Sequence, residues 1–512
     1  MRRRLLTSVA FAVTIVLVAV QSATTAVGVD SAALRTAVTT AGMQVHLAKF
    51  QKFGQASTAA FGHPTRVDGS LGFTKSVDYV AAQALAAGYQ VTVQPFTFDR
   101  YEETAPAVFE RTSPTARTYA LDSDFATMEY SGSGDVTAPL TAVGGIMIPS
   151  PGGSTSGCSS GDFAGFPTGN VALIQRGTCT FRTKADNAKA AGASGVVIFN
   201  EGDTADRSGL LFGTLSPPQM SLPVIGTSFA VGRELYDLLR TGAVTVHLAV
   251  QAHVVRTQSY NVLADTPGGL ADRVVVVGAH LDSVDAGPGI NDNGSGSAMI
   301  LEVAKQMSRV GITPTNKVRF AWWGGEEFGL LGAEHYLSTL PSSELKNIAL
   351  NLNFDMVASP NFVRFVYDGN GSATGTKGPS GSGNIEQVFL DYFASQGLAT
   401  EPTAFDGRSD YGPFIDRGIP AGGLFTGAED IKTAREAAIY GGTAGIAYDS
   451  CYHEACDTYP ANVNLTVLDQ MADATADAVL QFAMTTSSPN GRGKASTKAV
   501  AMTAFSGSLL RK

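Results

Sequence analysis

Two periodicities divide the chain into helical and extended segments. Residues 28–50 place apolar side chains three and four positions apart, which predicts a helix. The same spacing recurs over residues 74–90 and ends at Gly88, a residue type that commonly terminates helices. Residues 90–97 instead alternate between apolar and polar positions, as a half-buried strand does. A helix followed by a strand fits the opening of an α/β domain, so we expect one here.

Between residues 105 and 256 the pattern becomes one of short apolar runs separated by turn residues. The runs predict strands in TYALDSD (118–124), LTAVGGIMIP (140–149), NVALIQRG (170–177), SGVVIFNE (194–201), LPVIGTS (222–228) and VTVHLAV (244–250). One helix is predicted among them, at residues 181–191. The stretch 172–201 holds no cluster of histidines or carboxylates at the spacing of metal ligands. We therefore interpret residues 105–256 as a β-rich structural or binding module.

After residue 256 strands and helices alternate regularly. Strands are predicted at 259–268, 274–280, 317–323, 348–355, 362–367 and 419–425, and helices at 294–308, 329–339, 384–396, 410–417 and 464–485. This alternation predicts a mixed, mostly parallel sheet with helices on both faces, which is an α/β fold. Its active crevice is expected outside the carboxyl ends of the strands. The α/β domain then consists of two pieces, 28–104 and 257–486, with the module 105–256 inserted between them.

The two ends of the chain differ from the rest. Residues 1–27 combine a basic start, an apolar core and a run of small residues, which predicts a secretory signal peptide and an extracellular protein. An uncleaved anchor is the alternative, because the apolar run is only just short of a membrane span. No other segment is long and apolar enough to span, so we expect no stable membrane association after cleavage. Residues 487–512 are polar and locally basic, which predicts a disordered or processed tail, or else recruitment to a cell surface.

The net charge and the cysteine content of the chain bear on nucleic-acid binding and on disulfide formation. The net charge of -9 over 512 residues is spread along the chain and offers no case for nucleic acid. The four cysteines form two close pairs, Cys158 with Cys179 and Cys451 with Cys456. In an exported protein such pairs favour two disulfides. Buried free thiols and a cysteine zinc site are the alternatives.

The first candidate ligands lie at the end of a buried strand. His280 follows four consecutive valines, and Asp282, two residues on, points to the same side if the strand continues. A carboxylate in that position can hold an imidazole in one tautomer. Asp292 follows in a glycine-rich loop before the next helix, where it is either a helix cap or a carboxylate shared by two cations. Its place one short loop after His280 favours the shared carboxylate.

Later strand ends supply further carboxylates and a second histidine. Glu326 and Glu327 follow the next strand, and adjacent carboxylates in a crevice repel one another unless a cation neutralises them. One of them can bind metal while the other acts as general base. Asp355 ends a third strand, and His453 lies in a loop braced by a cysteine pair. The candidate ligands suit two zinc ions that share one carboxylate; they are His280, Asp292, Glu327, Asp355 and His453.

The segments HLDS, NDNGSG, GGEEFGLLG, NFDM, GRSDYGPF and CYHEACDT resemble the secreted bacterial di-zinc aminopeptidases related to aminopeptidase Y. The resemblance covers nearly all of the two-piece domain and implies a zinc-exopeptidase fold. It implies that His280 and Asp355 bind one zinc ion, that Glu327 and His453 bind the other, and that Asp292 bridges them.

The same resemblance implies roles for residues that bind no metal. Glu326 would be the general base, and Tyr452 would help to stabilise the oxyanion. Arg408 would lie near the amino end of the substrate, and Phe425 would line the pocket for the first side chain. The inserted module resembles a protease-associated domain in its order of Arg-Gly-x-Cys-x-Phe, a helix, Ala-Gly-Ala and a strand. The resemblance implies that Cys158 and Cys179 form an internal disulfide of this domain.

The implied activity is removal of the first residue, large and hydrophobic such as Leu, from peptides and proteins with a free N-terminus. A carboxypeptidase, a deacylase and a one-zinc glutaminyl cyclase are alternatives on the same fold. A receptor-like homologue without activity is another, although it requires missing ligands. Ca²⁺ is a second candidate cation, for which we assign no ligands.

Overall fold

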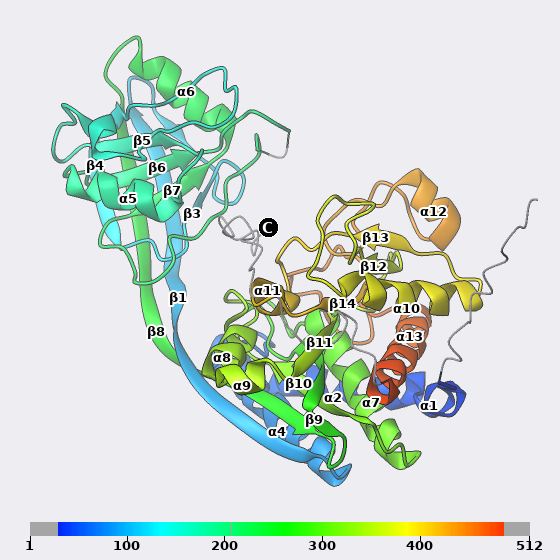
Figure 1. The fold of residues 1–512 in the computed structure, drawn as a ribbon. Helices are drawn as coiled ribbons and strands as arrows, with labels where there is room; N and C mark the ends of the chain where they lie inside the picture. Colours follow the sequence, from blue (N-terminus) through cyan, green and yellow to red (C-terminus); the bar gives the residue numbers. More distant parts are fainter. Residues whose placement is uncertain (1–28, 206, 486–512) are drawn as a thin grey trace, which may run out of the picture.

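The computed structural model describes residues 29–205 and 207–485. The predicted signal peptide (1–27) and tail (487–512) therefore lie outside the described residues. Figure 1 shows a larger body in which helices flank a sheet, and a smaller β-rich body carried at the far end of two long strands, β1 and β8. Among the described residues, no helix combines the length and apolar character needed to cross a membrane.

The sheet of the larger body has a mixed strand order. Its strands, from one edge to the other, are β1 (Gln90–Ser113), β8 (Thr245–Asp265), β10 (Asn316–Trp323), β9 (Leu270–His280), β11 (Ile348–Phe354), β14 (Ala421–Phe425), β12 (Phe365–Tyr367) and β13 (Glu401–Thr403). The pairs β10–β9, β9–β11, β11–β14 and β12–β13 are parallel, and the other three are antiparallel. The prediction of a mixed, mostly parallel sheet is confirmed.

The larger body contains helices that pack on both faces of this sheet and shorter ones in the connecting segments. They are α1 (Ala32–Ala37), α2 (Thr40–Ala56), α3 (Thr58–Phe61), α4 (Leu71–Ala86), α7 (Gly296–Arg309), α8 (Leu331–Thr339), α9 (Ser342–Leu345), α10 (Ser382–Ser395), α11 (Tyr411–Asp416), α12 (Ala434–Tyr440) and α13 (Leu465–Met484). Along β9, Val275 and Val277 belong to one hydrophobic cluster, whereas Val274 and Val276 belong to another on the opposite face. A run of consecutive valines is thus buried on both sides, as expected for a central parallel strand.

Several local predictions were incomplete. The single helix predicted at 28–50 is two helices, because the backbone is extended at Val38 and the Thr39 side chain accepts the Gly42 N–H as the cap of α2. Helix α12 was missed, although Thr433 and Glu436 form a capping box that the sequence displays. The strands predicted at 90–97 and 244–250 are parts of the much longer strands β1 and β8.

The inserted module is built on the outer halves of β1 and β8. Its remaining elements are β2 (Arg117–Thr118), β3 (Phe125–Thr127), β4 (Gly134–Ala142), β5 (Val171–Gln175), α5 (Phe181–Ala190), β6 (Gly195–Phe199), β7 (Val224–Thr227) and α6 (Phe229–Leu239). The strand predicted at 118–124 is wrong, since a turn separates β2 from β3 there, and α6 was not predicted. The boundaries expected near residues 104 and 256 fall inside β1 and β8, which pair continuously from one body to the other.

Both predicted cysteine pairs are disulfides. Cys158 is bonded to Cys179 in the module, and Cys451 is bonded to Cys456 in the larger body. No cysteine of the described chain is left free.

The packing of α6 against β6 gives a test of the module. A Cβ atom added at Gly232 would lie 2.0 Å from Phe199 Cγ and 2.1 Å from Phe199 Cβ, near the root of a fully buried side chain. Gly232→Ala should therefore destabilise the module by about 1–3 kcal/mol through overpacking. Gly242→Ala, where the added Cβ meets no atom within 4 Å, is the matched control and should leave the thermal transition unchanged. Equal melting temperatures for both variants would contradict this packing.

Candidate metal centre

The predicted ligands meet at one edge of the sheet. His280 is the last residue of β9, Glu326 and Glu327 follow the end of β10, and Asp355 directly follows β11. These three strands are parallel neighbours, so their carboxyl ends lie together. His453 arrives from the loop closed by the Cys451–Cys456 disulfide. His280, Asp292, Glu327 and Asp355 are buried and His453 is partly buried, and all of these ligands except His280 line one pocket.

Asp292 lies between the two histidines. Its Oδ1 atom is 3.1 Å from His280 Nε2, and its Oδ2 atom is 3.2 Å from His453 Nε2. Each histidine also faces a second carboxylate: His280 Nε2 is 3.3 Å from Asp355 Oδ1, and His453 Nε2 is 3.1 Å from Glu327 Oε2. A carboxylate with one oxygen on each side has the arrangement of a bridging ligand.

These separations of 3.1–3.3 Å lie at or slightly below those expected around a zinc ion. Donors at about 2.0–2.2 Å from a tetrahedral ion stand roughly 3.3–3.6 Å from one another. Among the described residues, Glu327 Oε2 and Asp355 Oδ1 are buried without any hydrogen bond, so both oxygens remain available to a cation. Nitrogen and carboxylate donors are also the types that zinc accepts. The residues present therefore fit a pair of zinc ions.

Two sets of three possible metal ligands have donor atoms that all lie within 4.8 Å of one another. These two sets differ from the assignment of ligands predicted from the sequence. One contains His280, Asp292 and Glu327, and the other contains His280, Glu326 and Asp355. Both use the same histidine, so they cannot describe two separate ions. The shortest nitrogen–oxygen distances favour Asp355 beside His280 and Glu327 beside His453, because Glu326 Oε2 lies farther away, 4.0 Å from His280 Nε2.

The electrostatics of the site also point to bound cations. Burial raises the pKa of Glu326 well above the usual carboxyl range, and the neighbouring Asp355 and Asp410 carboxylates add to the shift. Burial, with the neighbouring Asp292, raises the pKa of Glu327 to about 7. Burial opposes the charging of His453, but the Glu327 and Asp292 carboxylates raise its pKa to about 10. Buried carboxylates this close together are stable as anions only when positive charge offsets their repulsion.

Asp282 occupies the place expected for it behind His280. Its Oδ1 atom is 3.6 Å from His280 Nδ1, the ring nitrogen that faces away from Asp292. Its two oxygens accept the backbone N–H groups of Glu326 at 3.3 Å and Glu327 at 3.2 Å. Asp282 thus connects the end of β9 with the loop after β10, and a carboxylate in this position orients a metal-binding imidazole.

Two residues of the N-terminal piece were missed by the sequence analysis. The buried Arg66 guanidinium donates to the carbonyl oxygens of Leu281, Pro288 and Gly289, which flank the loop between His280 and Asp292. Asp68 accepts the backbone N–H of Gly325 at 2.8 Å. The short segment Thr-Arg-Val-Asp has no pattern that distinguishes it from a surface loop, so only its contacts identify it.

A second missed group fixes the disulfide loop against Asp292. The Asp457 carboxylate accepts the backbone N–H groups of Asn291 at 2.7 Å and Asp292 at 2.9 Å. Asp449 accepts the Asn291 side-chain amide at 2.6 Å, and the Asn462 amide donates to both Asp449 and Asp457.

Ser409 was missed as well, and its hydroxyl donates to Asp355 Oδ2 at 2.5 Å. The motifs CYHEACDT and GRSDYGPF contain Asp457 and Ser409, so the signal was present but not used.

The residues predicted to contact substrate line the same pocket. Arg408 Nη2 lies 3.1 Å from the Tyr452 hydroxyl and 2.9 Å from a Glu429 oxygen. Phe425 and Met356 form part of an apolar wall. The structure therefore brings together every residue that the sequence analysis placed in the site.

The comparisons with known proteins identify the families of both parts of the chain. Residues 261–479 match Peptidase family M28, and residues 136–235 match the PA domain. A protein of Pseudomonas aeruginosa called aminopeptidase is 48% identical over 82% of this chain and 77% of its own length. A probable leucine aminopeptidase 2 of Aspergillus fumigatus is 40% identical over 84% of this chain and 82% of its own.

Solved structures resemble the whole described fold. An aminopeptidase from Aneurinibacillus sp. strain AM-1 is 27% identical with a TM-score of 0.69, covering 89% of this chain and 96% of its own. A zinc aminopeptidase from Bacillus subtilis is 25% identical with a TM-score of 0.56, covering 86% and 96%. Since the sequence relatives match over most of their own length, the chain belongs to peptidase family M28 and carries a PA domain inserted into its peptidase fold.

Proposed function

We propose that this protein is a secreted, zinc-dependent aminopeptidase that holds two zinc ions per chain. The observation that carries the proposal is Asp292, whose two oxygens face His280 Nε2 and His453 Nε2 at 3.1 and 3.2 Å. His280 and Asp355 would hold one zinc ion, and Glu327 and His453 would hold the other. The Bacillus subtilis relative is described as a zinc aminopeptidase, which supports the same metal here.

The two zinc ions, when bound, would lower the pKa of a water molecule and polarise the scissile carbonyl group. Glu326 is the buried carboxylate of the pocket that lies outside both ligand sets, so it is placed to take the proton from that water and pass it to the leaving amine. The Tyr452 hydroxyl, held by Arg408 at 3.1 Å, would donate a hydrogen bond to the oxyanion.

The pocket favours a large hydrophobic first residue. Phe425, Met356 and Ala428 form an apolar cluster with Tyr452 and line one side of the cavity. The carboxylates that line the same cavity would bind the free α-ammonium group of a peptide. Cleavage would then be restricted to the first peptide bond. Relatives described as leucine aminopeptidases support this preference.

Export rests on separate observations. Residues 1–27 have the pattern of a signal peptide, and all four cysteines form disulfides, which persist in oxidising compartments. A carboxypeptidase, a deacylase and a glutaminyl cyclase remain alternatives on this fold. The receptor-like alternative is disfavoured because all five candidate ligands are present. We assign no residues to calcium.

Replacing the proposed base should separate chemistry from metal binding. Glu326→Gln is expected to lower kcat by about 10²–10⁴-fold, because the water loses its proton acceptor. The zinc content, measured by mass spectrometry of the metal, should stay near two per chain. Glu334→Gln is the control, since that carboxylate pairs with Arg417 on the surface of α8, and it should retain full activity. A near-normal rate in Glu326→Gln would show that another group is the base.

Removing one histidine should release one ion. His453→Ala takes a ligand from the zinc that it would share with Glu327, so the zinc content should fall from about two to about one per chain after dialysis. His335→Ala is the control, because His335 lies on α8 and stacks on Phe96. If His453→Ala retained two zinc ions with unchanged affinity, His453 would not be a ligand.

A blocked N-terminus should distinguish the alternatives. Leu-p-nitroanilide should be hydrolysed, and its N-acetyl form should be cleaved at least about 100-fold more slowly, since it lacks the ammonium group that the pocket would receive. Chelation of zinc should abolish both reactions. Comparable rates on the two substrates would favour a deacylase or an endopeptidase.

A further inference from the structure

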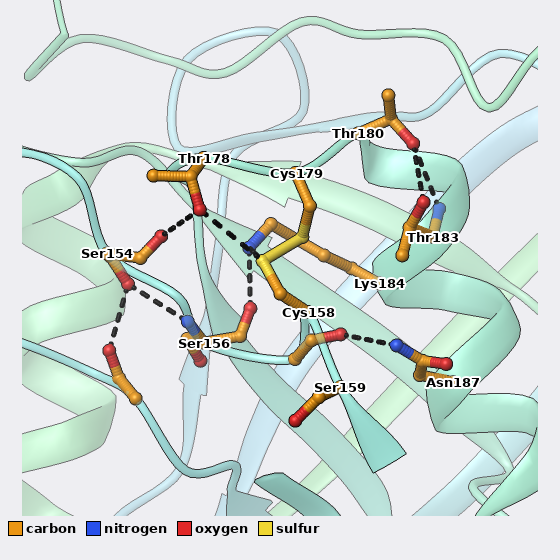
Figure 2. The surroundings of a disulfide bond; sticks show 12 residues. Ser154, Ser156, Cys158, Ser159, Thr178, Cys179, Thr180, Thr183, Lys184 and Asn187 are labelled. Carbon is orange, nitrogen blue, oxygen red and sulfur yellow. Dashed lines mark hydrogen bonds between the residues drawn. A yellow bond between two sulfur atoms is a disulfide. The ribbon is translucent and has the colours of Figure 1, made fainter. Parts of the chain in front are cut away.

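The disulfide of the PA domain lies beside a buried amine. Cys158 ends a turn in the loop before β5, and Cys179 immediately precedes Thr180, the N-terminal cap of helix α5. Lys184, one turn into that helix, is fully buried. Its Nζ atom lies 2.5 Å from the Ser156 carbonyl oxygen and 3.7 Å from Cys158 Sγ (Figure 2).

The Lys184 amine is positively charged near neutral pH. Burial lowers its pKa to about 8, while the Glu201 and Asp162 carboxylates act in the opposite direction. At pH 7 the ammonium form therefore predominates. An ammonium group within hydrogen-bonding reach of a sulfur atom stabilises the thiolate that forms when the disulfide opens.

The two sulfur atoms are therefore not equivalent. Cys158 faces the ammonium group, so it is the better leaving group of the pair. Both cysteines are half-buried and have exposed neighbours, so the contact with Lys184, and not access, distinguishes them. Attack at Cys179 is therefore favoured because it releases the more stable thiolate, that of Cys158.

Hydrogen bonds hold the loop independently of the disulfide. Thr178 N–H donates to the Ser154 carbonyl at 2.9 Å, and the Asn187 side chain donates to the Gly157 carbonyl at 3.0 Å. The Lys184 bond to Ser156 is a third connection of this kind, and Figure 2 shows the Lys184 and Asn187 contacts around the sulfur atoms. Opening the disulfide would therefore leave Cys158 near Cys179, in position to close it again.

The second disulfide, Cys451–Cys456, has different neighbours. The backbone N–H of Cys451 donates to Asp449 Oδ1 at 2.8 Å, and Asp457 directly follows Cys456. Both aspartates are buried. Among the described residues, neither sulfur atom of this pair has a lysine contact like that of Cys158, so this disulfide serves as the comparison for thiol exchange.

We propose that Cys158–Cys179 is a reversible exchange site for small-molecule thiols, in which Lys184 stabilises the departing Cys158 thiolate. The thiolate of the small molecule attacks Cys179 Sγ, the Cys158–Cys179 bond breaks, and its electron pair leaves on Cys158. The product is a mixed disulfide on Cys179 and a thiolate on Cys158. The reverse attack by Cys158 restores the original bond and releases the small molecule.

The order of reduction within one molecule tests the proposal. The folded, full-length protein would be incubated with graded reduced glutathione, quenched with acid, alkylated and mapped by mass spectrometry. We expect the Cys158–Cys179 pair to open at glutathione concentrations about tenfold or more below those needed for Cys451–Cys456. The glutathione adduct should lie on Cys179. Equal sensitivity of the two disulfides, or an adduct mainly on Cys158, would overturn the proposal.

Substitutions at Lys184 test the role of the charge. Lys184→Met keeps the length of the side chain, and the rate of glutathione reaction at Cys179 should fall about tenfold, whereas Lys184→Arg should keep most of it. Lys189→Met, at an exposed position of the same helix, is the control and should react like the wild type. An unchanged rate in Lys184→Met would refute the role of the amine. If the Lys184 variants do not fold, the order of reduction in the wild-type protein decides the question, and neither readout depends on peptidase activity.

Discussion

Much of this molecule is arranged around buried, negatively charged side chains at the carboxyl ends of neighbouring strands in one sheet. Asp292, Glu326, Glu327 and Asp355 are all buried there, and among the described residues two histidines, His280 and His453, lie within reach of them. Carboxylates at such distances repel strongly in a medium that screens poorly. A fold can keep them together only if cations are bound and if the surrounding backbone holds each group in place. The second requirement can be traced in the contacts around the site.

The supporting contacts come from segments far apart in the sequence. Arg66, near the N-terminus, donates to the carbonyls of the loop that carries Asp292. Asp457, near the C-terminus, accepts the N–H groups of the same loop. The loop is thus held from both ends of the peptidase domain, and the distance between His280 and His453 depends on the whole domain being folded. This explains why a site of few residues needs a large scaffold.

The PA domain is attached in a different way. Strands β1 and β8 run from the peptidase sheet into the module as one continuous antiparallel pair, so the junction consists of backbone hydrogen bonds (Figure 1). The module has its own hydrophobic clusters, its own disulfide and its own buried polar groups. Its internal chemistry, including the contact between Lys184 and Cys158, is therefore separate from the metal centre.

The sequence alone determined the fold class and the identity of the candidate ligands, because the strand periodicity and the ligand motifs are local patterns. His280, Glu327 and Asp355 could be placed at neighbouring strand ends by the rule that parallel strands share a crevice edge. The sequence could not show that β1 and β8 run unbroken through both bodies, since long strands look like separate short ones when bulges and changes of burial interrupt their pattern. Nor could it assign Arg66, Asp457 or Lys184, whose roles follow from contacts with residues distant in the chain or with backbone atoms. Tertiary structure decided these roles, because a buried polar side chain is defined by the partner that compensates its lost hydration.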